Sequence, residues 1–98
     1  MDSWTVQFNN ASWFSGVLVL TLKDGVVSGS DGRHTCSGTY AQDGHVLTSR
    51  VRVKRIDLQG DELFALDLTG TVEKGSGKAI GQICGTRTQL TGEITKLV

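Results

Sequence analysis

Two histidines and two cysteines are the residues of this chain best suited to metal binding or nucleophilic chemistry. His34 and Cys36 are two positions apart in a strand-like segment, so both side chains point to one face. A zinc site needs three or four ligands, and no second pair with ligand spacing accompanies this one. We therefore expect solvated histidines at strand ends, His34 and His45, and neither a metal nor a cofactor.

The two cysteines, Cys36 and Cys84, are far apart in the sequence. In a reducing compartment such residues stay as thiols and pack as small apolar side chains. We expect this state. The sequence leaves their pairing open, because it does not reveal whether their strands meet.

The segment Gly75-Ser76-Gly77-Lys78 resembles part of a phosphate-binding loop. The complete motif has a further glycine, separated from the Gly-Lys pair by four residues, and a Ser or Thr after the lysine. Val72 and Ala79 occupy those positions, so we expect an exposed hairpin tip. Since no nucleophile elbow or converging acid–base set is present either, we predict a protein without enzymatic activity.

Basic residues alternate along one strand-like segment, at Arg50, Arg52 and Lys54, with Val51 and Val53 facing the other way. A nucleic-acid platform interleaves such charges with stacking aromatic residues, and none is present here. We expect no nucleic-acid binding. The alternatives are a solvated outer face and a docking patch for an acidic protein surface.

Four aromatic residues are candidates for lining the mouth of a ligand cavity. In a small barrel such residues also serve as the plug of the core, which is the competing interpretation. The candidates are Trp4, Trp13, Tyr40 and Phe64.

The chain has 98 residues with ten basic and ten acidic side chains, which predicts one domain over 1–98 and no global field for an anionic partner. The acidic start is unlike a secretory signal, and the longest apolar run, 17–20, is too short to span a bilayer. We expect a cytoplasmic protein that makes no membrane contact.

Turn residues and a period of two dominate the chain. The dipeptides Asp24-Gly25, Asp31-Gly32 and Asp43-Gly44 separate alternating segments, which is typical of hairpins. Proline is absent, and no segment has a helical period. The expected strands are 4–8, 14–22, 26–30, 34–41, 45–55, 64–72, 79–86 and 90–95.

Glycines interrupt these strands, which favours strong curvature. Eight short-linked strands predict an all-β, antiparallel, up-and-down, lipocalin-like barrel with little or no helix. A five-stranded OB-like barrel is the competitor, but it usually carries a helix. Val17 and Val19 face away from the leucines of the same strand, so we expect a second subunit or another partner to cover them.

The stretches Gly16–Leu20, Asp24–Asp31 and Cys36–Tyr40 resemble the GrlR family of small bacterial barrels, negative regulators of type III secretion. The resemblance covers roughly residues 4–55. It implies a calycin-like barrel, dimerisation and a regulatory role. An acidic loop binds the partner in that family, whereas Ala41-Gln42-Asp43-Gly44 has a single acid, so the family's partner site has no counterpart here.

These observations predict a non-enzymatic barrel that acts through protein–protein interaction, with a homodimer or a protein partner. The candidate interaction faces are Val17 with Val19, and Arg50 with Arg52 and Lys54. The alternative is a lipocalin-like module that binds a small apolar ligand at the barrel mouth.

Overall fold

The structure is a computed structural model that describes residues 3–11, 16–30, 34–55 and 64–97. Asp31-Gly32 and Trp13, both singled out in the sequence, lie outside the described residues. The strands are β1 (Trp4–Ala11), β2 (Gly16–Lys23), β3 (Val26–Ser30), β4 (His34–Asp43), β5 (Val46–Arg55), β6 (Phe64–Glu73), β7 (Ser76–Ile83) and β8 (Gln89–Lys96). No helix occurs in these ranges, and accordingly none there is long and apolar enough to cross a membrane.

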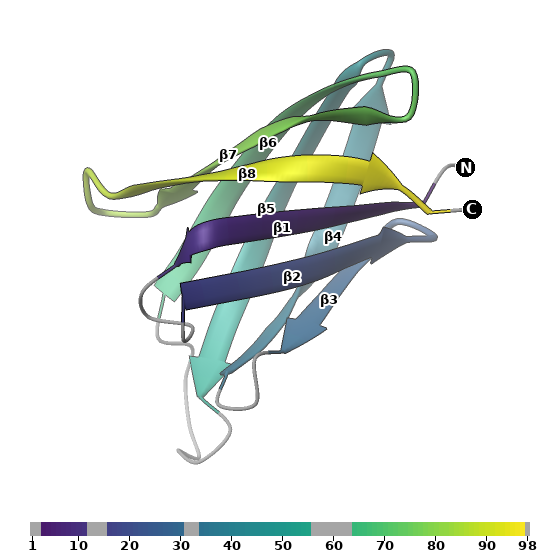
Figure 1. The fold of residues 1–98 in the computed structure, drawn as a ribbon. Coiled ribbons are helices and arrows are strands. Elements are labelled where there is room, and N and C mark those ends of the chain that lie inside the picture. Colours follow the sequence, from purple (N-terminus) through teal and green to yellow (C-terminus); the bar gives the residue numbers. More distant parts are fainter. Residues whose placement is uncertain (1–2, 12–15, 31–33, 56–63, 98) are drawn as a thin grey trace.

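The eight strands form a closed antiparallel barrel in chain order (Figure 1). Each strand pairs with the next, and β1 closes the barrel against β8, with Val6 opposite Ile94. In Figure 1 the strands β8, β1 and β2 cross in front of the more steeply inclined β4, β5 and β6. The predicted all-β barrel is therefore confirmed.

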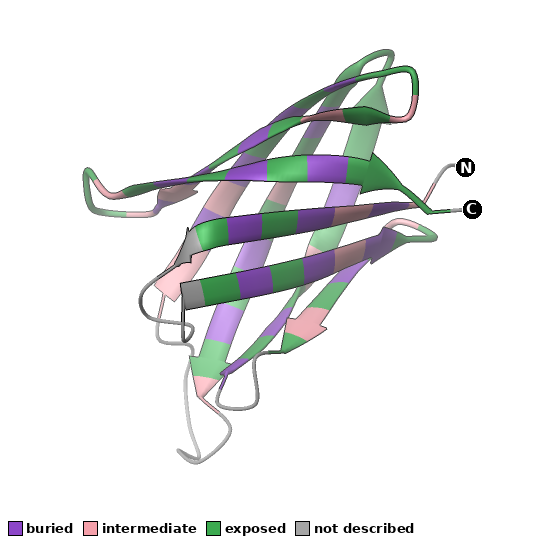
Figure 2. Cartoon of the chain, in the orientation of Figure 1, coloured by how far each residue is buried: buried purple, intermediate pink, exposed green. Residues whose placement is uncertain are grey.

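Alternation of buried and exposed residues along the strands builds the core (Figure 2). On β2, for example, Leu18, Leu20 and Leu22 are fully buried while Val17 and Val19 are exposed. Burying a side chain of this size contributes roughly 1.5–3 kcal/mol. Among the described residues, the hydrophobic side chains with no exposed surface are Val6, Phe8, Leu18, Leu20, Leu22, Val27, Leu47, Val51, Val53 and Leu66.

The hairpin turns differ in detail from the prediction. The turn after β4 is Gly44-His45, so Asp43 belongs to β4 and β5 begins at Val46. Asp24 and Gly25 both have positive φ, 54° and 81°, as a type I′ turn requires.

The prediction for the seventh strand was wrong at both ends. The turn before it is only Lys74-Gly75, with φ of 55° and 84°, and β7 starts at Ser76 rather than at Ala79. Gly77 fits in the strand because a Cβ there would overlap the Thr71 carbonyl oxygen. At the other end, Gly85 lies in a turn with φ of 81°, so β7 stops at Ile83 instead of running to 86.

Candidate functional site

The outer face of β4 and β5 carries basic residues beside hydroxyl residues. Outward positions recur every second residue on each strand, so the antiparallel register places each base directly opposite a hydroxyl. We call Arg50, Arg52 and Lys54 the basic ladder. Its cross-strand pairs are Thr39 with Arg50, Ser37 with Arg52, and Thr35 with Lys54.

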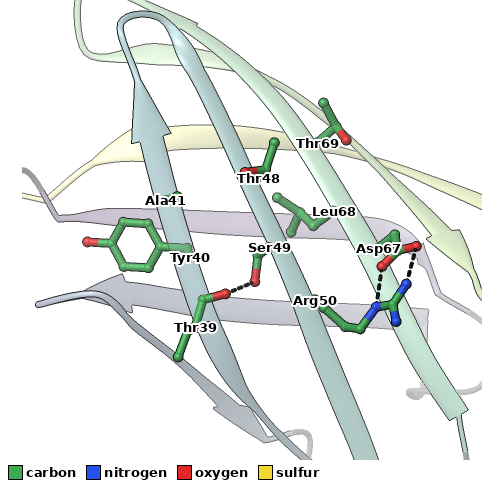
Figure 3. Close-up of a pocket in the computed structure, with 9 residues that line it drawn as sticks. All are labelled: Thr39, Tyr40, Ala41, Thr48, Ser49, Arg50, Asp67, Leu68 and Thr69. Carbon is green, nitrogen blue, oxygen red and sulfur yellow. Dashed lines mark hydrogen bonds and ion pairs between the residues drawn. The ribbon is translucent and has the colours of Figure 1, made fainter.

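Arg50 forms a two-point ion pair with Asp67, which lies opposite it on β6 (Figure 3). Arg50 Nε donates to Asp67 Oδ1 at 2.8 Å, and its Nη2 donates to Oδ2 at 3.1 Å. These bonds hold the pKa of Asp67 below its ordinary value, with a smaller lowering from the Cys84 thiol against an opposing desolvation. Both partners are exposed, so the pair orients the guanidinium more than it stabilises the fold.

Two open grooves flank this ion pair on the barrel's outer surface. One, of about 500 Å³, runs across β4, β5 and β6 (Figure 3). Its outward lining residues are Thr39, Ala41, Thr48, Arg50, Asp67 and Thr69. The other, of about 380 Å³, is lined by Ser37, Gly38, Thr39, Arg50 and Arg52. Hydroxyls and charges line both, so they suit polar ligands rather than apolar ones.

Three of the four aromatic cavity candidates, Trp4, Tyr40 and Phe64, lie in the described part of the chain, and they do not all come together. Trp4 is buried, and its Nε1 donates to Oε1 of Gln42 at 3.3 Å, which ties the start of β1 to the end of β4. Tyr40 is buried in the same core. Phe64 is the first residue of β6, at the opposite end of the barrel, and packs partly buried against the core. The described aromatic residues thus contribute to the core at two ends.

The valines of β2 form a separate surface. Val17 is 46% exposed and Val19 41% exposed, and β3 and β4 separate them from the basic ladder. Among the described residues, β2 pairs with β1 from Gly16 to Leu22, but with β3 only from Leu20 to Lys23. Figure 1 shows β3 turning away from β2 beyond their shared hairpin. The two interaction faces predicted from the sequence, the β2 valines and the basic ladder, are therefore separate surfaces of the barrel.

One histidine departs from expectation. His34 is 7% exposed and points inward at the start of β4, because its position shares the inward phase of Cys36, which is buried. His45 is exposed, and its Nδ1 lies 3.1 Å from the Val72 carbonyl oxygen.

Neither cysteine forms a disulfide: Cys36 is buried and Cys84 partly buried. Within the described ranges, no three metal-ligating side chains cluster.

Asp67 is the site residue that sequence reasoning missed. Its outward phase on β6 was readable, as was that of Arg50 on β5. Their pairing was not, because the alternation along a strand gives the faces of its side chains but not its register against the neighbouring strand.

Comparison of the chain with known protein families, with curated proteins and with solved structures found no match.

Proposed function

We propose that this chain is a non-enzymatic small β-barrel protein that acts through protein–protein contacts of its outer surface, in the first instance as a homodimer. The observation that carries the proposal is the pair of exposed valines on β2, whose opposite face is a row of fully buried leucines. A strand that is apolar on both faces is suited to burial on both.

The edge geometry of β2 supports a second copy as the occupant. Residues Gly16 to Val19 have β1 on one side and, in the described part of the chain, no ladder to β3 on the other. Charges or proline usually prevent a strand from pairing with a second chain, and 16–22 contains neither. Two such edges can pair antiparallel about a two-fold axis, which makes one patch self-complementary.

The electrostatics favour self-association too. The formal net charge is zero, so two copies experience little long-range repulsion. The resemblance of residues 4–55 to the GrlR family is the reason for including a regulatory role and a cytoplasmic location in this proposal. Without the family's acidic loop, the contact surface has to be one that this chain itself presents.

Sedimentation velocity of the wild-type protein tests the proposal. We expect a dimer that dissociates on dilution, and a shift to monomer in the double variant Val17→Thr/Val19→Thr, because threonine keeps the strand-favouring branch but not the apolar surface. The matched control is Val46→Thr, on β5, where the valine is also 41% exposed. A wild-type monomer at every concentration, or equal dissociation in the control, would overturn the homodimer.

A further inference from the structure

The groove of about 500 Å³ on β4, β5 and β6 is lined by outward side chains in two cross-strand rows (Figure 3). One row runs from Ala41 through Thr48 to Thr69, and the other from Thr39 through Arg50 to Asp67. Neighbours within a row are about 4.8 Å apart, and the rows are separated by about 6.7 Å, twice the rise per residue of a strand. A single small ligand in the groove can therefore contact several of these side chains at once.

The threonine hydroxyls of these rows have hydrogen-bonding capacity to offer a ligand. Within the described residues, no protein group bonds to the hydroxyl of Thr39, Thr48 or Thr69. Ser49, by contrast, donates its hydroxyl to the Thr39 carbonyl oxygen at 2.6 Å, so that group is already engaged and helps to fix β4 against β5. A hydroxyl both donates and accepts hydrogen bonds. The groove therefore suits a ligand that itself presents several hydroxyl groups.

The ion pair between Arg50 and Asp67 makes the groove polar without giving it a net charge. Arg50 donates two hydrogen bonds to the carboxylate, and the Cys84 thiol also bonds to it. An ionised carboxylate has about four acceptor positions, so the exposed Asp67 keeps the capacity for about one further donor. A charged ligand has to separate Asp67 from Arg50, whereas a neutral hydroxyl group can bond beside the intact pair.

Small apolar groups lie between the polar ones. Ala41 contributes only a methyl group. Thr48 and Thr69, directly opposite each other on β5 and β6, each carry a methyl group beside the hydroxyl. A sugar ring has the same two characters, with C–H groups on its faces and hydroxyl groups around its edge. Sites for small molecules combine an apolar lining with a few placed polar groups, so this lining matches a neutral carbohydrate better than a purely apolar ligand.

We propose that the groove across β4, β5 and β6 binds a neutral carbohydrate. The hydroxyls of Thr48 and Thr69 bond to neighbouring hydroxyl groups of the sugar, and the Asp67 carboxylate accepts a hydrogen bond from a further one. Because the groove is open, the bound sugar stays partly in solvent, and we expect a dissociation constant on the order of 1 mM. The proposal goes beyond the homodimer and does not depend on it, since β3 separates this groove from the valines of β2.

Amide NMR spectra recorded during titration with maltotriose, cellotriose and triacetylchitotriose test the proposal. We expect saturable shifts on β4, β5 and β6 of the wild-type protein with at least one of these neutral sugars. The variant Thr48→Val/Thr69→Val keeps the branched shape but removes two hydroxyls, and it should weaken that binding by about tenfold. The matched control is Thr71→Val/Thr95→Val, the same change at exposed threonines outside the groove lining.

Binding should also be insensitive to salt, because the ligand carries no charge. The absence of shifts with all of these sugars at about tenfold above the expected constant would overturn the proposal, as would equal weakening in the folded control. Tighter, salt-sensitive binding of a sulfated oligosaccharide in the same groove would overturn the neutral ligand. The β2 variant Val17→Thr/Val19→Thr should bind the sugar normally, so failure of the dimer and failure of the sugar site give different results.

Discussion

The indole Nε1 of Trp4 donates a hydrogen bond to Oε1 of Gln42, at 3.3 Å, between the first residue of β1 and the ninth residue of β4. The same Gln42 amide donates from Nε2 to the Gly44 carbonyl oxygen, at 3.1 Å. One exposed glutamine therefore fixes both a buried aromatic side chain and the hairpin between β4 and β5. The bond between Trp4 and Gln42 joins residues that are 38 positions apart in the sequence.

We expect Gln42→Ala to lower the free energy of unfolding by about 1 kcal/mol, because the buried indole loses its acceptor. Trp4 fluorescence should also shift as water reaches the N–H group. Urea denaturation of both proteins gives the measurement. The control is Gln7→Ala on the exposed face of β1, where we expect a smaller loss. Identical midpoints for Gln42→Ala and Gln7→Ala would contradict this role.

The assignment of strand faces can be tested on two adjacent residues of β5. Leu47 is fully buried and Val46 is 41% exposed. We expect Leu47→Ala to destabilise the protein by roughly 2–5 kcal/mol, through lost burial and the cavity left behind. Val46→Ala should change stability by only about 0.5 kcal/mol. Thermal unfolding of the two variants checks the prediction, and similar losses at both positions would mean that the register is shifted.

The ion pair on β5 and β6 predicts a pH effect. The folded-state pKa of Asp67 lies below its ordinary value of 3.8, mainly because Arg50 donates to the carboxylate. A lowered pKa stabilises the fold at pH above the unfolded value, and this contribution is lost as the pH falls through the folded value. The window is therefore the acidic range below 3.8. Because both side chains are exposed, we expect a small effect on stability.

NMR titration of the Asp67 carboxyl carbon measures this directly. In Arg50→Gln the pKa of Asp67 should rise toward its ordinary value, since the first cause of the lowering is removed. Arg52→Gln, one rung along the same strand face, should leave the titration close to that of the wild type. An Asp67 titration that does not respond to Arg50→Gln would show that the pair does not form in solution.

Much of the strand pattern could be predicted because it is local. The period of two assigned Leu18 and Leu20 to the interior and Val17 and Val19 to the outside, and the structure places them so. The Asp24-Gly25 turn followed from its residue types. The limits of β7 did not follow from residue types. Lys74 adopts a positive φ, which is unfavourable for lysine and is imposed by the pairing of β6 with β7.

The sequence by itself determined that this protein is an all-β chain with buried and exposed faces, since alternation and turn chemistry act over a few residues. The tertiary structure alone decided which faces meet. It closed β1 against β8, buried His34, set Asp67 opposite Arg50 and placed the valines of β2 away from the basic ladder. The physical reason is register: neighbouring strands are matched by the packing of the whole interior, and a shift of one residue would turn every side chain of a strand to the other face.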